Sequence, residues 1–182
     1  QISVIVANSS EIEQEVLTNG VDLGIVEGII RNRDLIVTPV CEDELVLVCG
    51  KEHPLAKEKL VTMEMLQGQD YVSRESGSAE RNQFEQLFEE YGLQLNRTFC
   101  STNTEAIKNA VIRGRGIAIF SKRMIKDEVS DGRMVIVPVK DVSVKRNIDL
   151  VLHKNKYVSN EIRIMQEILT KEEAQYAVDN LE

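Results

Sequence analysis

The segment from Cys100 to Ser121 limits the fold of this chain most strongly, because it contains the whole pattern of a loop, a capped helix, a stop and a buried strand. It reads CSTNTEAIKNAVIRGRGIAIFS. Thr102 and Glu105 have the spacing of a capping box at the start of a helix. Gly114 supplies the left-handed residue that commonly ends one. Ile117–Phe120 is a continuous apolar run, which is typical of a strand buried on both faces.

The same pattern occurs ninety-four residues earlier. Asn8–Val26 reads NSSEIEQEVLTNGVDLGIV, and laid without gaps on Thr102–Phe120 it places Gly20 on Gly114. One interpretation is that any two loop–helix–strand units look somewhat alike. The interpretation we favour is two lobes of similar build, each directing a capped helix N-terminus toward a common ligand. Unpaired amides and the helix dipole favour anions or polar groups there.

Composition excludes several classes of function for these residues. The net charge is −8 and only 4% of residues are aromatic. Gripping a nucleic-acid backbone needs clustered positive charge, and reading single strands needs aromatic platforms. No apolar run reaches the roughly 18 residues of a membrane span. Three cysteines without metal-binding spacing predict no metal site and suit a reducing, cytoplasmic compartment.

The order of elements predicts an α/β fold with mostly parallel sheets. We expect strands at residues 1–7, 21–26, 35–40, 45–49, 71–73, 117–120, 134–139 and 148–153. We expect helices at residues 11–19, 63–66, 79–91, 105–113, 121–129 and 160–170. Ser10 and Glu13 offer a capping box for the first helix.

A second polar loop precedes the helix expected at residues 79–91. Ser76-Gly77-Ser78 follows a short strand, an arrangement that can hold an anion at the helix N-terminus. Alternatively, Ser76 or Ser78 is simply an N-cap, and both roles are compatible. Arg74 offers a counter-charge, although it can equally form an ordinary surface pair with Glu75.

The sequence shows no catalytic constellation. Catalysis needs a nucleophile with a base, or paired carboxylates with separated pKa values. His53 and His153 each lie beside a lysine-rich turn rather than near a serine loop. We therefore predict a binding domain with no catalytic residues and no cofactor.

Four motifs in series resemble a known family. They are Val21-Asp22-Leu23-Gly24-Ile25, His53-Pro54-Leu55-Ala56, Arg74-Glu75-Ser76-Gly77-Ser78 and Gly114-Arg115-Gly116-Ile117-Ala118. In this order and spacing they resemble the effector-binding domain of LysR-type transcriptional regulators, over about residues 1–170. The resemblance implies the type 2 periplasmic-binding-protein fold. That fold has two Rossmann-like lobes joined by a two-strand hinge, with a ligand cleft between them.

The resemblance also implies a domain plan and a site. Lobe I would comprise residues 1–71, incomplete at its N-terminus, and be completed by about 155–182; lobe II would be residues 72–154. A DNA-binding winged helix-turn-helix would lie outside these residues. The effector site would include Asn8, Ser9, Arg74, Ser76, Gly77, Ser78, Ser101, Thr102 and Asn103.

The implied partner is a small-molecule effector, either a small anion or a carboxylated metabolite. The implied assembly is a homodimer or homotetramer, pairing through the helices expected at 11–19 and 105–113. It would contact DNA only through the N-terminal domain and would not contact a membrane. An alternative with the same fold is the solute-binding protein of a transporter. The residues before Gln1 would separate the two, since one needs a helix-turn-helix and the other an export signal.

Overall fold

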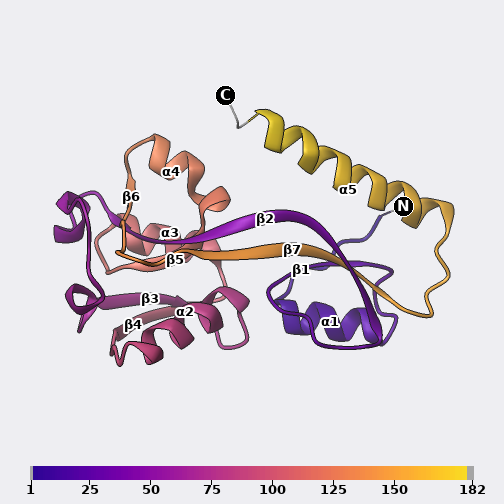
Figure 1. Ribbon diagram of the computed structural model, residues 1–182, viewed down its shortest axis with the longest axis horizontal. Helices are drawn as coiled ribbons and strands as arrows, with labels where there is room; N and C mark the ends of the chain where they lie inside the picture. Colours follow the sequence, from indigo (N-terminus) through magenta and orange to yellow (C-terminus); the bar gives the residue numbers. More distant parts are fainter. Residues whose placement is uncertain (1, 180–182) are drawn as a thin grey trace. The chain divides into compact units, whose positions relative to one another are not determined.

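The computed structural model describes residues 2–179 and divides into two compact units (Figure 1). The first unit comprises residues up to 42 and from 146 onward, and the second comprises Asp43–Lys145. Two long strands, β2 (Leu35–Gly50) and β7 (Val144–His153), each pass from one unit into the other. The two-strand connection therefore crosses at 42/43 and 145/146 rather than at the predicted 71/72 and 154/155.

The difference in boundaries has a packing cause. Leu45, Leu47, Leu55, Leu66 and Tyr71, which the sequence assigned to lobe I, are all buried in one core of the second unit. These side chains pack in one cluster with residues of the helix and strands that follow, so the segment 43–71 cannot separate from them without exposing apolar surface.

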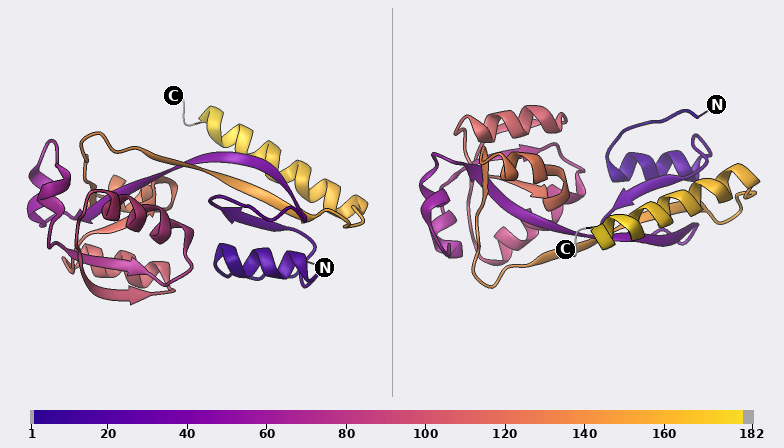
Figure 2. Two further views of the ribbon diagram at one scale, coloured as in Figure 1. Left: turned by 60° about the horizontal axis from the view of Figure 1, so that its bottom comes forward. Right: turned by 90° about the horizontal axis from the view of Figure 1, so that it is seen from above.

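The first unit contains four elements besides the start of β2. These are α1 (Ser9–Leu17), β1 (Gly24–Glu27), most of β7 and α5 (Asn160–Asp179). Strand β1 runs antiparallel to β7, with Val26 opposite Asp149. Helix α1 covers one face of this pair (Figures 1 and 2), and its buried residues Ile12 and Val16 form a core with Val26 and Val151. Leu150 and Leu152 of β7 pack with Ile162 of α5 in a separate cluster.

The second unit holds the larger core. Its strands are β3 (Asp70–Arg74), β4 (Asn96–Ser101), β5 (Ala118–Ser121) and β6 (Met134–Ile136). Its α-helices are α2 (Ala79–Glu90), α3 (Thr104–Ile112) and α4 (Lys126–Ser130), and its 3-10 helices are η1 (Pro54–Lys57), η2 (Met63–Leu66) and η3 (Lys122–Ile125).

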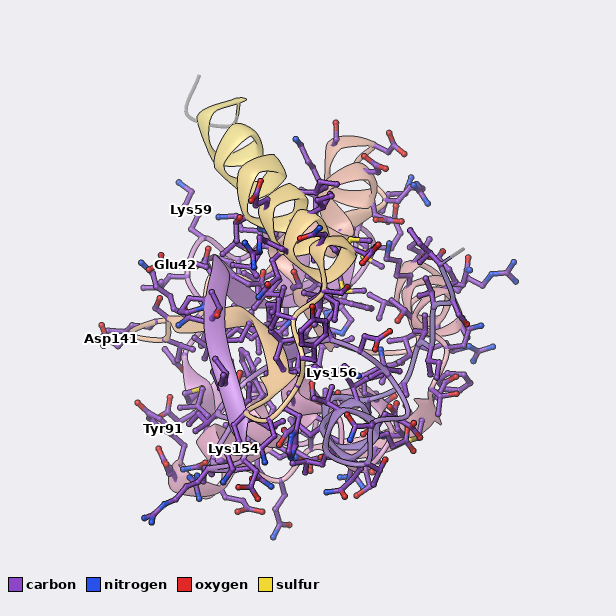
Figure 3. The ribbon with its side chains drawn as sticks, turned by 90° about the vertical axis from the view of Figure 1, so that its right-hand side faces the viewer. Glu42, Lys59, Tyr91, Asp141, Lys154 and Lys156 are labelled. Atoms are coloured by element: carbon purple, nitrogen blue, oxygen red, sulfur yellow. The ribbon has the colours of Figure 1, made fainter. Side chains whose placement is uncertain are left out.

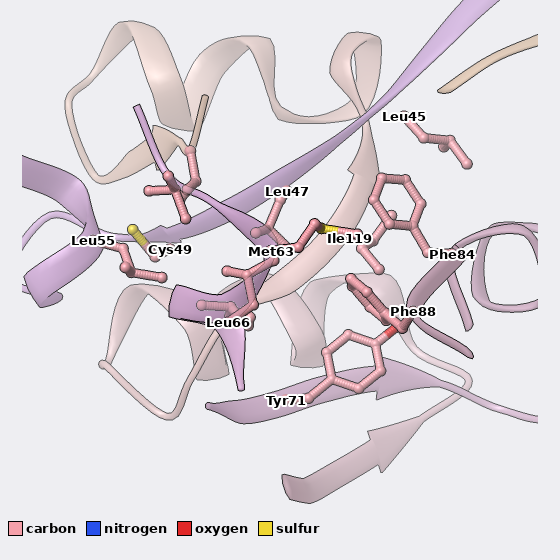
Figure 4. Packing of buried hydrophobic residues seen from close by; sticks show 13 residues of the cluster. Leu45, Leu47, Cys49, Leu55, Met63, Leu66, Tyr71, Phe84, Phe88 and Ile119 are labelled. Atoms are coloured by element: carbon pink, nitrogen blue, oxygen red, sulfur yellow. The ribbon is translucent and has the colours of Figure 1, made fainter. Parts of the chain in front are cut away.

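Two clusters occupy the two faces of the strands in the second unit. Tyr71 and Ile119 pack with Phe84 and Phe88 of α2, and Figure 4 shows Leu45 and Phe84 at one end of this cluster with Leu55 at the other. On the opposite face, neighbouring residues of the same strands pack against α3. Successive residues of a strand point to opposite faces, so each strand contributes side chains to both clusters.

Two predictions about the strands are wrong. The sheets are not mostly parallel: β1–β7, β2–β5 and β2–β6 are antiparallel, and β3–β4 is the parallel pair. Residues 2–7 have the composition of a strand but do not form one, and Ile2, Val4 and Val6 are 73%, 77% and 93% exposed. A strand needs a partner for its amides and carbonyls, and within residues 2–179 no strand pairs with this segment.

Candidate functional site

The polar loops of the second unit begin side by side. Strands β3 and β4 are parallel, and Arg74 at the end of β3 is paired with Ser101 at the end of β4. Parallel strands end at the same edge of a sheet, so the loops that follow them emerge together. The structure thus brings Ser76–Ser78 and Ser101–Asn103 to one edge of the second unit, where α2 and α3 begin.

The start of α3 is capped by Asn103. Its Oδ1 accepts from the amide of Ala106 at 3.0 Å, so the predicted capping box of Thr102 and Glu105 is wrong by one residue. Ser101 Oγ accepts from the amide of Asn103 at 3.0 Å. That bond uses a lone pair of Ser101, so its hydroxyl proton remains able to donate to a ligand. Thr102 lies exposed between these two residues.

Arg74 is held by its neighbours. Its Nε and Nη2 donate to the two carboxylate oxygens of Glu75 at 2.9 and 3.1 Å, and its Nη1 donates to Thr104 Oγ1 at 2.9 Å. The hydrogen bonds from Arg74 are the main cause that lowers the pKa of Glu75. The pair is internally neutralised, so Arg74 joins the end of β3 to the start of α3 but adds little net charge.

The loop before α2 takes a different form from the loop before α3. Gly77 has φ +94°, which only glycine adopts easily, and Ser78 occupies the N-cap position. The Ser78 hydroxyl makes no capping hydrogen bond, although Ser78 is 5% exposed. The first-turn amides of a helix have no partner within the helix, so those of α2 remain suited to an anionic or polar ligand.

Asn8 and Ser9 lie in the first unit, at the start of α1. Asn8 Oδ1 accepts from the Glu11 amide at 3.0 Å and the Glu11 carboxylate accepts from the Asn8 amide at 3.3 Å. The capping box is therefore formed by Asn8 and Glu11 rather than the predicted Ser10 and Glu13. Ser9 Oγ accepts from the Glu27 amide at 3.2 Å, which fastens the start of α1 to the end of β1.

Sequence reasoning missed a group of buried charges in β7. The Arg146 side chain is 1% exposed and its Nη1 lies 2.7 Å from Glu27 Oε2. Asp149 is 6% exposed, its Oδ1 has no hydrogen-bond partner among the described residues, and burial raises its pKa. The charged residues of this strand resemble a solvated face in sequence. The sequence did contain a signal. Asp149 lies two residues before Val151, which is apolar and buried, so the two side chains lie on the same face of the strand.

The two histidines have local structural roles. His53 Nδ1 accepts from the Leu55 amide at 3.2 Å and so caps η1, and burial lowers its pKa. His153 Nδ1 accepts from the Asn155 amide at 3.2 Å. In the described part of the chain, no three His, Cys, Asp or Glu residues are grouped as a metal would require, and no helix has the length and apolarity to cross a bilayer.

The lysines just beyond β7 are paired with carboxylates. Figure 3 labels Lys154 and Lys156, whose Nζ atoms lie 2.5 Å from Asp34 Oδ1 and 2.7 Å from Asp22 Oδ1. The bond from Lys154 lowers the pKa of Asp34. These pairs join the loops on either side of β1 to the end of β7.

Comparison with known proteins decides the family. The model of the LysR substrate binding domain matches residues 1–174. The chain belongs to this family. It is 34% identical over 162 residues to the HTH-type transcriptional regulator YeiE of Escherichia coli K12, covering 89% of this chain and 55% of that protein. The chain spans about half the length of the curated relatives it matches.

Two solved structures show the fold. The regulatory domain of Synechocystis PCC6803 CcmR, in complex with 2-PG, matches with a TM-score of 0.86 and 24% identity, over 94% of this chain and 82% of that one. The effector-binding domain of QuiR, in complex with shikimate, matches with a TM-score of 0.80 and 21% identity, over 93% and 79%. The predicted α/β fold of the type 2 periplasmic-binding-protein kind is confirmed.

Proposed function

We propose that this LysR substrate-binding domain senses a small-molecule effector for a transcriptional regulator. The observation that carries the proposal is the pairing of Arg74 with Ser101, which starts two serine-rich loops at one edge of a parallel strand pair. The starts of α2 and α3 lie there, and Ser76, Gly77, Ser78, Ser101, Thr102 and Asn103 would contact the effector.

The groups at this edge favour a small anion or a carboxylated metabolite. The first-turn amides of the helices and the hydroxyl proton of Ser101, whose oxygen accepts from Asn103, are available to donate to a ligand, while Arg74 is already paired with Glu75. Donors with little net positive charge suit a singly or partly charged acid rather than a highly charged polyanion. Two structural neighbours are in complex with small molecules, 2-PG and shikimate, which supports an effector of that size.

The relatives support a regulator rather than the solute-binding protein of a transporter, because they are HTH-type transcriptional regulators. Effector binding would change how a homodimer or homotetramer holds DNA in the cytoplasm. DNA would be contacted by a helix-turn-helix domain outside these residues. The domain would bind its effector without converting it, since both histidines serve local structure.

A ligand panel with paired variants tests the proposal. Small carboxylates and phosphates should raise the melting temperature of the protein, and Ser101→Ala should weaken the best of them about tenfold in a calorimetric titration, the equivalent of one charge-assisted hydrogen bond. Ser130→Ala is the matched control, because Ser130 is exposed at the end of α4. An effect of equal size in both variants, or no shift with any acid, would contradict the proposal.

A further inference from the structure

Three neighbouring strands of the second unit change from apolar to polar at the same end of one face. Tyr71 is followed by Ser73 in β3, Ile119 is followed by Ser121 in β5, and Leu45 is preceded by Asp43 in β2. Residues two apart lie on the same face of a strand, and the three apolar members share the core beneath α2. We call Asp43, Ser73 and Ser121 the polar row.

The register staggers the polar row along one end of this face. Strand β5 is antiparallel to β2, with Leu45 opposite Ser121, and it is joined to β3 by a parallel bridge between Tyr71 and Ile117. Moving two residues along β3 and β5 brings Ser73 beside Ile119, with Ser121 following. In Figure 4, Leu45 and Phe84 mark this end of the core.

The polar row is buried although it is polar. Ser73, Ser121 and Asp43 are 1%, 3% and 5% exposed. The Ser121 hydroxyl donates to Asp43 Oδ1 at 2.7 Å. Ser73 Oγ has no hydrogen-bond partner among the described residues.

A second unpartnered atom comes from α2. The Tyr71 and Phe88 rings meet edge to face at 6.3 Å. Helix α2 connects the parallel strands β3 and β4, so it runs back along β3 in the opposite direction. Two residues of a strand cover about 6.6 Å, which corresponds to roughly four or five helical residues of about 1.5 Å each. Gln83 therefore lies level with Ser73. Gln83 Oε1 is buried and has no hydrogen-bond partner within the described residues.

Two unpartnered buried atoms at a similar height, one on β3 and one on α2, indicate a partner from outside the protein. Buried polar atoms are nearly always hydrogen-bonded, and leaving one unpaired reduces stability. Gln83 Oε1 can only accept, and Ser73 Oγ can both donate and accept. The complement is a group that carries a hydroxyl or amino proton, because a carboxylate offers no proton to Gln83.

We infer that Ser73, Gln83 and the polar row form a hydrogen-bonding subsite for a hydroxyl or amino group of the effector. This inference rests on the proposed function, in which the starts of α2 and α3 hold the acidic end. The effector class is then a small acid with hydroxyl or amino substituents. A plain inorganic anion or an unsubstituted carboxylic acid lacks the group that the subsite accepts.

The first experiment measures stability without any ligand. Ser73→Ala and Gln83→Met each remove an unpaired polar atom while preserving most of the volume, so each should raise the melting temperature by about 2–4 °C. Ser130→Ala should leave it unchanged. A fall in melting temperature in both variants would show that the two atoms stabilise the ligand-free domain, and the inference would be overturned.

The second experiment compares acids that differ in their hydroxyl groups. Glycerate is paired with propionate, and quinate with cyclohexanecarboxylate, in calorimetric titrations of wild type, Ser73→Ala and Gln83→Met. The hydroxylated acid of a pair should bind wild type about tenfold more tightly, and the advantage should disappear in both variants. Equal binding of both members would overturn the subsite and leave the sensing function standing. Failure of every acid to bind would remove both.

Discussion

The two helix–strand modules, α1–β1 in the first unit and α3–β5 in the second, are built alike at their helices. Each helix has nine residues and begins with an asparagine cap, Asn8 or Asn103. Each is followed two residues after its end by a residue with positive φ, Asn19 at 59° or Gly114 at 72°. These helices correspond at an offset of 95 residues rather than the 94 of the ungapped sequence match.

The strands of the two modules correspond at a different offset. Strand β1 begins at Gly24 and β5 at Ala118, which are 94 residues apart. The connection from helix to strand is therefore one residue shorter in α3–β5. The lesson is that local sequence can specify the same helix twice, while the strand beside it is placed by different neighbours.

The largest expected loss of stability comes from the close approach between the α3–β5 module and strand β3. Gly116 has φ +134°, and a Cβ there would lie 2.2 Å from the Asp70 carbonyl oxygen, while Ile117 donates to that same oxygen at 2.8 Å. Gly116→Ala should destabilise the protein by at least about 3 kcal/mol in chemical denaturation, because backbone rather than a side chain must move.

Gly114→Ala is the control for this substitution. Gly114 also has positive φ, but a Cβ there meets nothing within 4 Å. Its cost should be about 1 kcal/mol, the conformational part alone. Similar losses for the two alanine variants would refute the close approach at Gly116.

The second prediction tests how closely each helix packs on its strand. A Cβ on Gly24 would lie 2.7 Å from Ile12 Cγ2 of α1, whereas the matching position in β5 is Ala118, which already carries a Cβ. Gly24→Ala should cost about 2 kcal/mol through overpacking. Ala118→Gly should cost about 1 kcal/mol through backbone entropy. A neutral Gly24→Ala variant in urea melts would show that α1 does not press on β1.

The third prediction concerns Asp149, a buried acidic residue that is paired with the strand of the α1–β1 module, whereas the corresponding position beside the α3–β5 module is apolar. Val26 of β1 is opposite Asp149, while the matching Phe120 of β5 is opposite Val46. Burial raises the pKa of Asp149, so folding favours its protonated form. Stability from this group is present below its ordinary pKa of about 3.9 and is lost as pH rises through the raised folded value.

Replacing the Asp149 carboxylate should therefore stabilise the protein at neutral pH. Asp149→Asn should raise the free energy of unfolding at pH 7 by about 1 kcal/mol, and the gain should shrink as the pH approaches 4. Denaturant melts across this pH range measure it. A gain that is constant with pH would assign the effect to packing instead of ionisation.

Sequence reasoning found the polar loops because their evidence is local. Serine, threonine and asparagine before an amphipathic stretch predict a helix start, and Ser101–Asn103 and Ser76–Ser78 lie where this rule places them. It missed what depends on distant partners. Ile2–Val6 has strand composition, yet a strand requires a neighbour, and the burial of Asp149 and Ser73 depends on which elements cover them.

The smallest expected effect is the difference in stability between removing the Asn8 cap and removing the Asn103 cap. Asn8 and Glu11 bond reciprocally, whereas Asn103 accepts one bond and is supported by Ser101. Asn103→Ala should cost about 1 kcal/mol. Asn8→Ala should cost slightly more, because the Glu11 carboxylate also loses the geometry that holds its bond to the Asn8 amide.

Glu11→Ala in the Asn8→Ala background should then add almost nothing, since the two residues act as one cap. An additive double variant in urea melts would show that Glu11 stabilises α1 through the helix dipole rather than through the box.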